Sequence, residues 1–332
     1  MVIVIGASGF IGTYLVNELL ENGYEVVATG RNAAAAKFFH DKNIKYVKLD
    51  IAEQSDFNKL PKENIEAVIL LAALLPANVT DENPYEYIDT NITGTVNVLE
   101  FCVRHGIKKL ISTTSYADVR NFWSAKEDIV ADSLRNYSLT DDHAIYVISK
   151  NAATDLMLYY NYRHGMNCSI FRLPPVYGVG PHSGLFVDGV WKKSGFQIFV
   201  EKASLGEPIT IFGDKNIIRD IVYVKDVASA FVKAIKSSFA KGVYNIGSGE
   251  SSSIEQQVID IVSVFTSEKG KSEIIYDTSI QNSSKSYRFD ISKAQKDFGY
   301  VPQYVPFKKL VIQYKKDLEE IDIEHLKNQY HK

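Results

Sequence analysis

The first twelve residues constrain the fold of this chain more than any other segment. An apolar run at residues 2–5 leads directly into the glycine-rich turn Gly6-Ala7-Ser8-Gly9-Phe10-Ile11-Gly12. A buried strand that turns through glycines into a helix presents bare backbone N–H groups at the positive helix end, where a pyrophosphate can bind. The early glycines allow close approach of the phosphate, and the last one allows helix and strand to pack closely. The pattern predicts a dinucleotide site only if a strand and a helix flank it, because a glycine-rich turn alone is only a turn.

A second informative feature is the pair Tyr146 and Lys150, which lies in a helix-like stretch. A spacing of four residues places both side chains on one helix face, where the ammonium group can lower the pKa of the phenol. The spacing alone is weak evidence, because Tyr304 and Lys308 repeat it around Pro306, where a regular helix is not expected. The order and context of the two features therefore matter more than either one.

Apolar strand-like runs alternate with helix-like stretches along the first half of the chain. The runs lie at residues 2–5, 25–29, 45–49, 67–72, 109–112 and 168–172. This rhythm predicts an α/β fold with a Rossmann-like, doubly wound parallel sheet.

Beyond residue 173 the pattern loosens into a loop-rich region that we interpret as the start of a substrate lobe. Residues 221–224 and 243–246 nevertheless indicate further strands, and Asp226 is expected to be the N-cap of a following helix. We therefore predict a smaller, interleaved C-terminal substrate lobe. The dinucleotide-binding domain comprises residues 1–175 and about 216–247, and the lobe comprises residues 176–215 and 248–332.

Composition narrows the possible classes of function. A chain of 332 residues with 45% hydrophobic residues can bury a substantial core. Its net charge is −3 and it has no basic block, so we expect no nucleic-acid partner. The longest apolar run, residues 67–76, is shorter than the ~20 residues that span a bilayer, and the chain begins without a signal-peptide pattern. We therefore expect a cytoplasmic protein without membrane association.

Cysteine and histidine usage gives two further expectations. Cys102 and Cys168 are far apart in sequence and lie in apolar patterns, which favours buried free thiols over a disulfide. The seven histidines are scattered without ligand-like spacing, so no metal site is expected.

In their order along the chain, these motifs resemble the extended short-chain dehydrogenases/reductases, specifically the nucleotide-sugar epimerase/dehydratase group. The resemblance covers nearly the whole chain. Besides the glycine turn and the Tyr–Lys pair, it rests on Asp50-Ile51, Leu71-Ala72-Ala73, Asn91-x-x-Gly94-Thr95, Ser112-Thr113-Thr114, Arg172-Leu173-Pro174-Pro175-Val176-Tyr177-Gly178, Arg219-Asp220-Ile221-Val222-Tyr223-Val224-Lys225-Asp226, and Tyr244-Asn245-Ile246-Gly247.

The resemblance implies an enzyme that binds NAD(P)(H). The implied cofactor-binding residues are Gly6, Ser8, Gly9, Phe10, Ile11, Gly12, Arg31, Asp50, Ile51, Leu71, Ala72, Ala73, Asn91, Ser112, Tyr146 and Lys150. From the residues alone, Asp50 is equally an ordinary loop carboxylate and Asn91 an ordinary helix residue.

The implied catalytic residues are Tyr146 as the general acid/base, Lys150, and the hydroxyl of Thr114. Free tyrosine has a pKa of about 10, so Tyr146 needs help from Lys150 and from the positive charge of the oxidised nicotinamide. Ser112, Thr113 and Ser115 are neighbours that could replace Thr114. The alternative interpretation is that these hydroxyls satisfy backbone groups at a strand end.

The end of the second predicted strand bears on cofactor choice. NAD-preferring members carry an acidic side chain there, which binds the ribose diol. This chain has Gly30 at that position, followed by Arg31. Loss of the carboxylate removes a repulsion, and a guanidinium can pair with a 2′-phosphate. We therefore favour NADP(H) over NAD(H), against the alternative that Arg31 is a solvated turn residue.

The implied substrate is a nucleotide-diphosphate sugar. Arg219 and Arg288 correspond to positions that contact the diphosphate, while Thr114 and Ser115 face the sugar. The alternative is that the two arginines form surface pairs, Arg219 with Asp220 and Arg288 with Asp290.

Departures from the family pattern limit the choice of reaction. Pro175 stands where many members carry a substrate-contacting asparagine, and Leu70 replaces a frequent histidine. Thr114 is followed by Ser115 and Tyr116, where sugar 4,6-dehydratases have an acidic pair, which disfavours a dehydratase. The leading hypothesis is a nucleotide-sugar epimerase acting at C4 through a transient 4-keto intermediate. The alternatives are an NADPH-dependent 4-ketosugar reductase and a non-catalytic, cofactor-binding regulatory protein. The resemblance also implies a homodimer, with helices near residues 91–105 and 146–164 at its interface.

Overall fold

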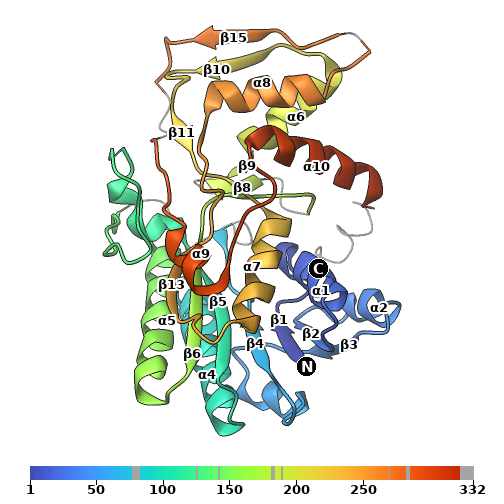
Figure 1. Ribbon diagram of the computed structural model, residues 1–332, viewed down its shortest axis with the longest axis vertical. Helices are drawn as coiled ribbons and strands as arrows, with labels where there is room; N and C mark the ends of the chain where they lie inside the picture. Colours follow the sequence, from blue (N-terminus) through green and yellow to red (C-terminus); the bar gives the residue numbers. More distant parts are fainter. Residues whose placement is uncertain are drawn as a thin grey trace.

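A seven-stranded parallel sheet forms the centre of the computed structural model (Figure 1), which describes residues 1–76, 83–124, 126–140, 143–180, 184–187, 190–268, 270–281 and 285–321. In chain order its strands are β1 (Val2–Ile5), β2 (Val26–Gly30), β3 (Lys45–Lys48), β4 (Ala67–Leu70), β5 (Lys109–Ser115), β6 (Asn167–Leu173) and β13 (Gly242–Asn245). The spatial order is β13-β6-β5-β4-β1-β2-β3. Because the order reverses between β1 and β4, a crevice opens beyond the carboxyl ends of these strands, which is where ligands bind in such sheets.

Helices cover both faces of the sheet. One hydrophobic cluster contains Val2 and Val4 of β1, and it joins that face to α1 (Phe10–Glu21), α2 (Ala35–His40), α7 (Val224–Lys236) and α9 (Ser292–Phe298). A second cluster contains Ile3 and Ile5, and it joins the opposite face to α4 (Gly94–Arg104), α5 (Ala144–Arg163) and the short helix η1 (Gln54–Lys59). The strands read as unbroken apolar runs because both of their faces are buried. The predicted fold class, a doubly wound α/β sheet, is confirmed.

A smaller third cluster lies above the sheet in Figure 1. It packs α6 (Gly195–Leu205), α8 (Ile254–Val264) and α10 (Phe307–Glu320) against the two-stranded sheet of β10 (Ile209–Phe212) and β15 (Ile274–Asp277). The remaining short elements are α3 (Pro84–Tyr87), the π-helical turn η3 (Ile88–Thr93), η4 (Tyr116–Phe122), β7 (Val176–Tyr177), β8 (Gly184–Val187), β9 (Val190–Lys193), β11 (Ile218–Arg219), β12 (Val222–Tyr223) and β14 (Ser252–Ser253).

The structure differs from the sequence prediction in the region around residue 224. The strand expected at residues 221–224 is the two-residue β12, which pairs with β7 and not with the central sheet. Helix α7 begins at Val224 after the N-cap residue Tyr223, so Asp226 lies inside the first turn. Its buried carboxylate accepts hydrogen bonds from the backbone N–H groups of Gln303 (2.7 Å) and Tyr304 (3.2 Å). Asp226 thus joins two distant segments, a role that local sequence does not reveal.

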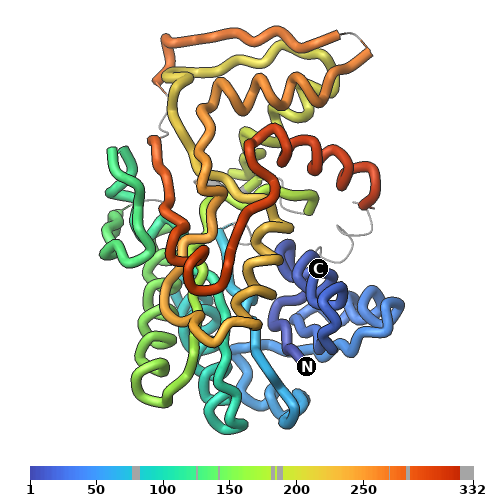
Figure 2. The backbone as a smooth tube through the Cα atoms, in the orientation of Figure 1, coloured from blue at the N-terminus to red at the C-terminus, as the bar shows by residue number. Residues whose placement is uncertain are grey.

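The segment around α9 returns from the substrate-lobe range to the sheet (Figure 2). Ile291, Ala294, Phe298 and Tyr300 belong to the cluster formed by α1 and α7. These residues therefore pack with the dinucleotide-binding half of the molecule, although they lie within the range 248–332 that we assign to the lobe.

Two expectations concern the cysteines and membrane association. Cys102 and Cys168 are free and buried, as predicted. In the part of the chain that the structure describes, every helix is too short or too polar to cross a bilayer.

Candidate active site

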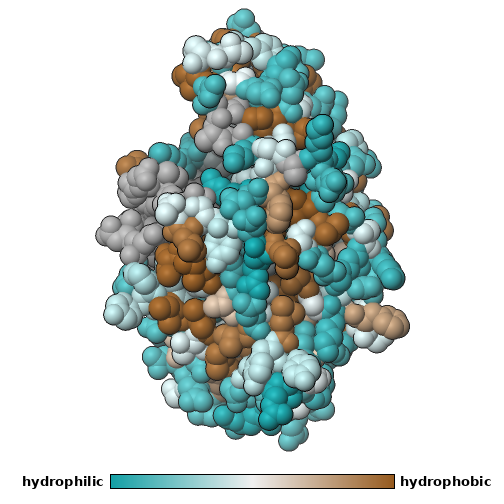
Figure 3. Space-filling model, turned by 90° about the vertical axis from the view of Figure 1, so that its left-hand side faces the viewer, coloured by the Kyte–Doolittle hydropathy of each residue, from teal (hydrophilic) through white to brown (hydrophobic). Residues whose placement is uncertain are grey.

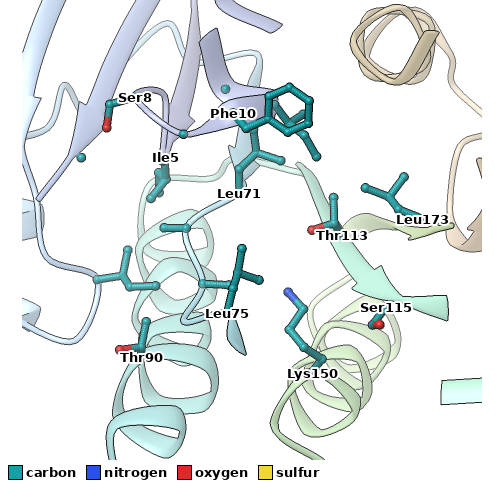
Figure 4. A pocket seen from close by; sticks show the side chains of 18 of the residues that line it. Ile5, Ser8, Phe10, Leu71, Leu75, Thr90, Thr113, Ser115, Lys150 and Leu173 are labelled. Carbon is teal, nitrogen blue, oxygen red and sulfur yellow. The ribbon is translucent and has the colours of Figure 1, made fainter. Parts of the chain in front are cut away.

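A cleft of about 720 Å³ opens at the carboxyl ends of β1, β2, β4, β5 and β6 (Figure 4). It brings together most of the residues that the sequence singled out. Those that line it are Gly6, Ser8, Gly9, Phe10, Ile11, Gly12, Arg31, Ile51, Leu71, Ala72, Ala73, Thr114, Ser115, Tyr146 and Lys150. Among the described residues that line the cleft none is acidic, whereas Arg31 and Lys150 are cationic. The cleft is therefore suited to an anionic ligand.

The glycine turn is too crowded for side chains. Gly6 has a φ of +89°, and a Cβ atom there would lie 2.6 Å from the backbone nitrogen of Ala72. A Cβ atom at Gly12 would lie 2.3 Å from the carbonyl oxygen of Gly6. Gly9 is the N-cap of α1. Only glycine fits at positions 6 and 12, and the N-cap residue Gly9 adds no side chain over the N-terminal N–H groups of α1, as a dinucleotide pyrophosphate requires.

The end of β2 offers hydroxyl groups in place of a carboxylate. A Cβ atom at Gly30 would lie 2.8 Å from Ser8 Oγ and 2.9 Å from the hydroxyl oxygen of Tyr46. Tyr46 donates a hydrogen bond to the Asn32 carbonyl (2.7 Å), and burial raises its pKa to about 12, so the phenol stays neutral. The exposed Arg31 stands beside this pair of hydroxyls.

Tyr146 and Lys150 both line the cleft from α5. Figure 4 shows the Lys150 side chain extending from the helix into the space between Leu75 and the β5 residues Thr113 and Ser115. Burial lowers the pKa of Lys150 to about 8. Burial also raises the pKa of Tyr146 above its usual range, and a hydrogen bond with the Ser115 side chain opposes that rise. An apolar setting thus keeps the phenol protonated until a nearby positive charge arrives.

The hydroxyls at the end of β5 differ in their partners. Thr114 is 3% exposed, and its Oγ1 atom is buried without a hydrogen-bond partner while the residue lines the cleft. Ser115 shares a hydrogen bond with Tyr146, and its Oγ also accepts one from the Ala117 N–H group (3.2 Å). An unpartnered buried hydroxyl beside a cleft indicates a place where a ligand supplies the missing partner.

Three of the predicted residues lie outside the cleft lining. Ser112 donates its hydroxyl hydrogen to the Leu70 carbonyl (2.8 Å). The Asp50 carboxylate accepts a hydrogen bond from the Ala52 N–H group (3.0 Å). The Asn91 amide bonds to both backbone groups of Leu74 (2.8 and 3.2 Å) and donates to Ser149 Oγ (2.9 Å). Asn91 therefore joins the segment after β4 to α5, and the cofactor role of all three residues stays a prediction.

The two predicted diphosphate ligands also lie outside the cleft lining. Burial raises the pKa of the Tyr116 phenol, and the charge of Arg219 opposes that rise, which places this arginine beside a residue that does line the cleft. Arg288 pairs with Asp128 (2.7 Å) and not with Asp290, and it lines a second hollow of about 360 Å³. Asp220 is buried, and its carboxylate accepts hydrogen bonds from the backbone N–H (2.8 Å) and the hydroxyl (2.7 Å) of Ser248.

Sequence reasoning missed other residues of the site. Asn32, Leu75, Thr90, Tyr116, Leu173 and Pro174 line the cleft, and Tyr46 lies against its second-strand end. Leu173 and Pro174 lie inside a recognised motif and Tyr116 directly follows Ser115, so membership or proximity was an available signal. Nothing in the sequence links Tyr46 to Ser8, because the two meet only when β2 and β3 pair.

The strand order, the glycine turn and the Tyr–Lys pair in one cleft define a dinucleotide-binding protein of the short-chain dehydrogenase/reductase class. A profile of the NAD dependent epimerase/dehydratase family matches residues 2–247, and the chain belongs to this family.

Similar proteins extend over almost the whole chain. A UDP-glucuronate 4-epimerase of Thermodesulfobacterium geofontis is 30% identical, over 91% of this chain and 91% of that protein. A putative UDP-glucose 4-epimerase of Methanocaldococcus jannaschii is 29% identical, over 91% and 93%. Among solved structures, the UDP-glucose 4-epimerase of Thermotoga maritima with UDP-glucose superposes with a TM-score of 0.77 at 22% identity, over 96% and 98% of the two chains. The UDP-glucose 4-epimerase of Thermus thermophilus in complex with NAD gives a TM-score of 0.74 at 23% identity, over 97% and 99%. These superpositions confirm the fold.

Proposed function

We propose that this protein epimerises a nucleotide-linked sugar, with UDP as the carrier, at C4 through a transient 4-keto intermediate. The observation that carries the proposal is the cleft itself, because it holds the phosphate turn, Tyr146, Lys150 and the unpartnered Thr114 hydroxyl in a single cavity without a carboxylate among its described lining residues. The choice of UDP as the carrier rests on two similar proteins, which are named as a putative UDP-glucose 4-epimerase and a UDP-glucuronate 4-epimerase.

The chain's own residues account for the proton transfer. The glycine turn would hold the pyrophosphate of a nicotinamide dinucleotide, which would supply reversible hydride transfer at C4 of the sugar. Tyr146, ionised once the positive charge of the oxidised cofactor lies beside it, accepts the proton of the 4-hydroxyl as the C4–H bond breaks, which leaves a C4 ketone. After the 4-keto sugar has rotated in the site and hydride has returned to C4, Tyr146 gives the proton back to the 4-oxygen.

Lys150 and the β5 hydroxyls assist Tyr146. The Lys150 ammonium stabilises the ionised phenol, since both groups line the same apolar cleft. The Ser115 side chain, hydrogen-bonded to Tyr146, lowers the pKa of the phenol in the same direction. Thr114 has a free hydroxyl with which to orient the 4-oxygen.

The test is to incubate the purified protein with a panel of UDP-, GDP-, CDP- and dTDP-sugars and each nicotinamide, while sugar products and cofactor redox state are followed together. We expect interconversion of two UDP-sugar epimers at C4 without net cofactor consumption. Full activity of Tyr146→Phe would contradict the mechanism. Tight cofactor binding without turnover of any sugar would support the regulatory alternative.

A second candidate is an NADPH-dependent reductase of nucleotide-linked 4-keto sugars, favoured by the end of β2. Arg31 provides a guanidinium there and Ser8 a hydroxyl, and Gly30 adds no negative charge. We propose that this end binds the 2′-phosphate of NADP(H) in preference to the ribose diol of NAD(H). A reductase would oxidise NADPH stoichiometrically with a keto sugar.

The cofactor preference has its own test. We expect tighter binding of NADP than of NAD at equal salt, and Arg31→Ala is expected to remove about tenfold of the NADP affinity while it leaves the NAD affinity unchanged. Lys37→Ala, in the neighbouring helix α2, is the matched control. Tighter NAD binding by the unaltered protein would overturn the preference.

We also propose that the protein forms a homodimer through α4 and α5. Tyr159 and Tyr162 of α5 are 53% and 90% exposed. Figure 3 shows apolar patches on the side of the molecule along which α5 runs. The test is mass determination by light scattering: we expect a dimer, and Tyr159→Glu combined with Tyr162→Glu should give a monomer. A monomeric unaltered protein would contradict the proposal.

A further inference from the structure

Arg172 and Asn245 belong to recognised motifs, but the proposed function gives them no role. Both occupy one row across the sheet: Thr114 of β5 lies opposite Arg172 of β6, and Arg172 lies opposite Asn245 of β13. Neighbours in a parallel sheet point to the same face, and Ile170 of β6, two residues before Arg172, packs with α5. The row therefore faces the helix that carries Tyr146.

Asp118 completes this arrangement. Arg172 Nε donates to both carboxylate oxygens of Asp118 (2.9 and 3.1 Å), and Nη2 donates to one of them (2.9 Å). Arg172 Nη1 donates to Asn245 Oδ1 (3.0 Å) and to the Ala131 carbonyl (3.1 Å). Asp118, Arg172 and Asn245 are 3%, 2% and 1% exposed. Every nitrogen of a buried guanidinium is thus in use.

The contacts extend from the cleft to the substrate lobe. Asp118 lies in η4, which begins directly after Ser115, the last residue of β5. Asn245 Nδ2 donates to the carbonyls of Ile129 (2.8 Å) and Asp290 (3.0 Å), the latter in the segment that also carries Arg288. One guanidinium therefore connects the end of β5, which bears Thr114 and Ser115, with the loop at residues 129–131 and, through Asn245, with the segment at Asp290.

A buried ion pair is a costly way to stabilise a fold. Both ions lose hydration, and replacement of such a pair by apolar residues of similar volume is often neutral or stabilising. Removal of one partner alone is destabilising, because the other charge is left buried. Apolar side chains would therefore serve a purely structural role equally well. The presence of the ion pair indicates that the positions of Arg172 and Asp118 themselves matter.

We propose that the Arg172–Asp118 pair, with Asn245, is the positioning element that fixes the end of β5, with Thr114 and Ser115, beside Tyr146. Within the pair, the Arg172 guanidinium offsets the negative charge that Asp118 would otherwise place beside the phenol. This inference rests on the proposed role of Tyr146 in proton transfer. The pair acts through Thr114 and Ser115, and it touches neither the substrate nor the cofactor.

The electrostatic part follows from the groups that face Tyr146. Lys150 comes from the same helix, Ser115 from β5, Tyr87 from α3, and Tyr116 and Asp118 from η4. The negative charge of Asp118 acts to raise the pKa of Tyr146, as do the other two phenols. Because the paired guanidinium offsets the carboxylate, the phenol can ionise beside it.

Two variants separate charge from position. Asp118→Asn keeps the shape but leaves Arg172 unpaired, and a guanidinium stays charged at all accessible pH values. The pKa of Tyr146 should then fall by about half a unit or more. The double variant Arg172→Met with Asp118→Leu removes both charges, so the pKa of Tyr146 should stay near its value in the unaltered protein. Its kcat should fall at least about tenfold, because the hydrogen bonds that position the end of β5 are lost.

The pKa is read by ultraviolet difference titration with oxidised cofactor bound, with Tyr146→Phe as the reference that identifies the phenol. This measurement needs no sugar, so it stands even if no nucleotide sugar is turned over and the proposed function fails. Circular dichroism and cofactor affinity show whether each variant is folded. The double variant carries no buried unpaired charge, so it keeps the test decisive if Asp118→Asn does not fold.

The control is Glu201→Gln. It breaks the exposed pair between Lys193 of β9 and Glu201 of α6, and neither residue is among the groups that face Tyr146 or Asp118. We expect it to change neither the Tyr146 pKa nor kcat. An unshifted pKa in folded Asp118→Asn would overturn the electrostatic part, and full kcat in the folded double variant would overturn the positioning part.

Discussion

The two ends of the cleft are built in opposite ways. The phosphate end is made by missing side chains: Gly6, Gly9 and Gly12 lie on a single turn, and backbone atoms fill the space that Cβ atoms at Gly6 and Gly12 would need. The hydroxyl end is made by present side chains: Thr114 comes from β5, and Tyr146 and Lys150 come from α5. The first end depends on local geometry, and the second on how separate elements meet.

The two ends also differ in how polar groups are satisfied. The glycine turn leaves helix N–H groups facing the cleft, and those groups belong to the backbone whatever the sequence around them. At the other end, a buried threonine hydroxyl lacks a partner and a buried lysine has a lowered pKa. We therefore expect binding to depend mainly on the first end, and reactivity on the second. Substitutions at the first end should therefore affect mainly cofactor binding, and substitutions at the second end mainly turnover.

The largest effect is expected from Tyr146→Phe. Loss of the acid/base hydroxyl should lower kcat by about 1,000-fold, within the range that general acid–base catalysis supplies. Cofactor affinity should change far less than turnover, because the glycine turn is intact. Parallel measurement of turnover and of cofactor binding by fluorescence checks both. Weaker cofactor binding together with the lost turnover would show that the two ends are not independent.

The reverse separation is expected from Gly12→Ala. The new methyl group would lie 2.3 Å from the Gly6 carbonyl oxygen, so the turn must open and the cofactor affinity should fall by about 100-fold. Gly195→Ala is the matched control, since a Cβ atom there meets nothing within 4 Å. Equilibrium binding of the cofactor to both variants is the measurement. Normal affinity of Gly12→Ala would contradict the crowding that defines this end.

A smaller effect is expected from Thr114→Val. Loss of the hydroxyl should lower kcat by about tenfold, while replacement of an unpartnered buried hydroxyl by a methyl group should raise the unfolding free energy by about 1 kcal/mol. Ser112→Ala is the control on the same strand, because it loses the bond to the Leu70 carbonyl. It should lose about 1 kcal/mol of stability, and its kcat should fall less than that of Thr114→Val. The opposite pattern in the two variants would assign the reacting hydroxyl to Ser112.

The smallest effect is a pH dependence that arises from Lys150. Burial lowers its pKa from 10.5 to about 8 in the folded state. Between these values the unfolded chain binds more protons than the folded one, so stability rises with pH through this window. Activity should fall above pH about 8, because the ammonium then loses its charge. Unfolding curves of the unaltered protein and of Lys150→Met should converge as the pH rises, and a constant difference would contradict the buried charge.

The parts of the structure that the sequence predicted share one property: each is encoded by consecutive residues. The turn at residues 6–12 and the Tyr146–Lys150 spacing need only a strand or a helix to acquire their geometry. Asp226 shows the limit of this reasoning. Its position resembles a helix N-cap, but its partners are backbone groups at residues 303 and 304. Local patterns do not report bonds between segments that are distant in sequence.

The return of α9 to the sheet and the contact between Tyr46 and Ser8 were equally hidden. Phe298 reads from sequence as one apolar residue in a lobe, yet it packs with α1 and α7. A side chain's burial energy is the same against any apolar neighbour, so hydrophobic pattern alone does not choose the neighbour.

The sequence by itself determined the α/β class, the glycine turn and the placement of Tyr146 and Lys150 on one helix face, because strand and helix periodicity and the steric needs of glycine act within a few residues. Only the tertiary structure decided that Thr114 is left without a partner, that Ser115 meets Tyr146, and that Arg172 is buried against Asp118. The physical reason is that hydrogen bonds and buried charges depend on distances of about 3 Å between segments, and those distances exist only after the sheet has assembled.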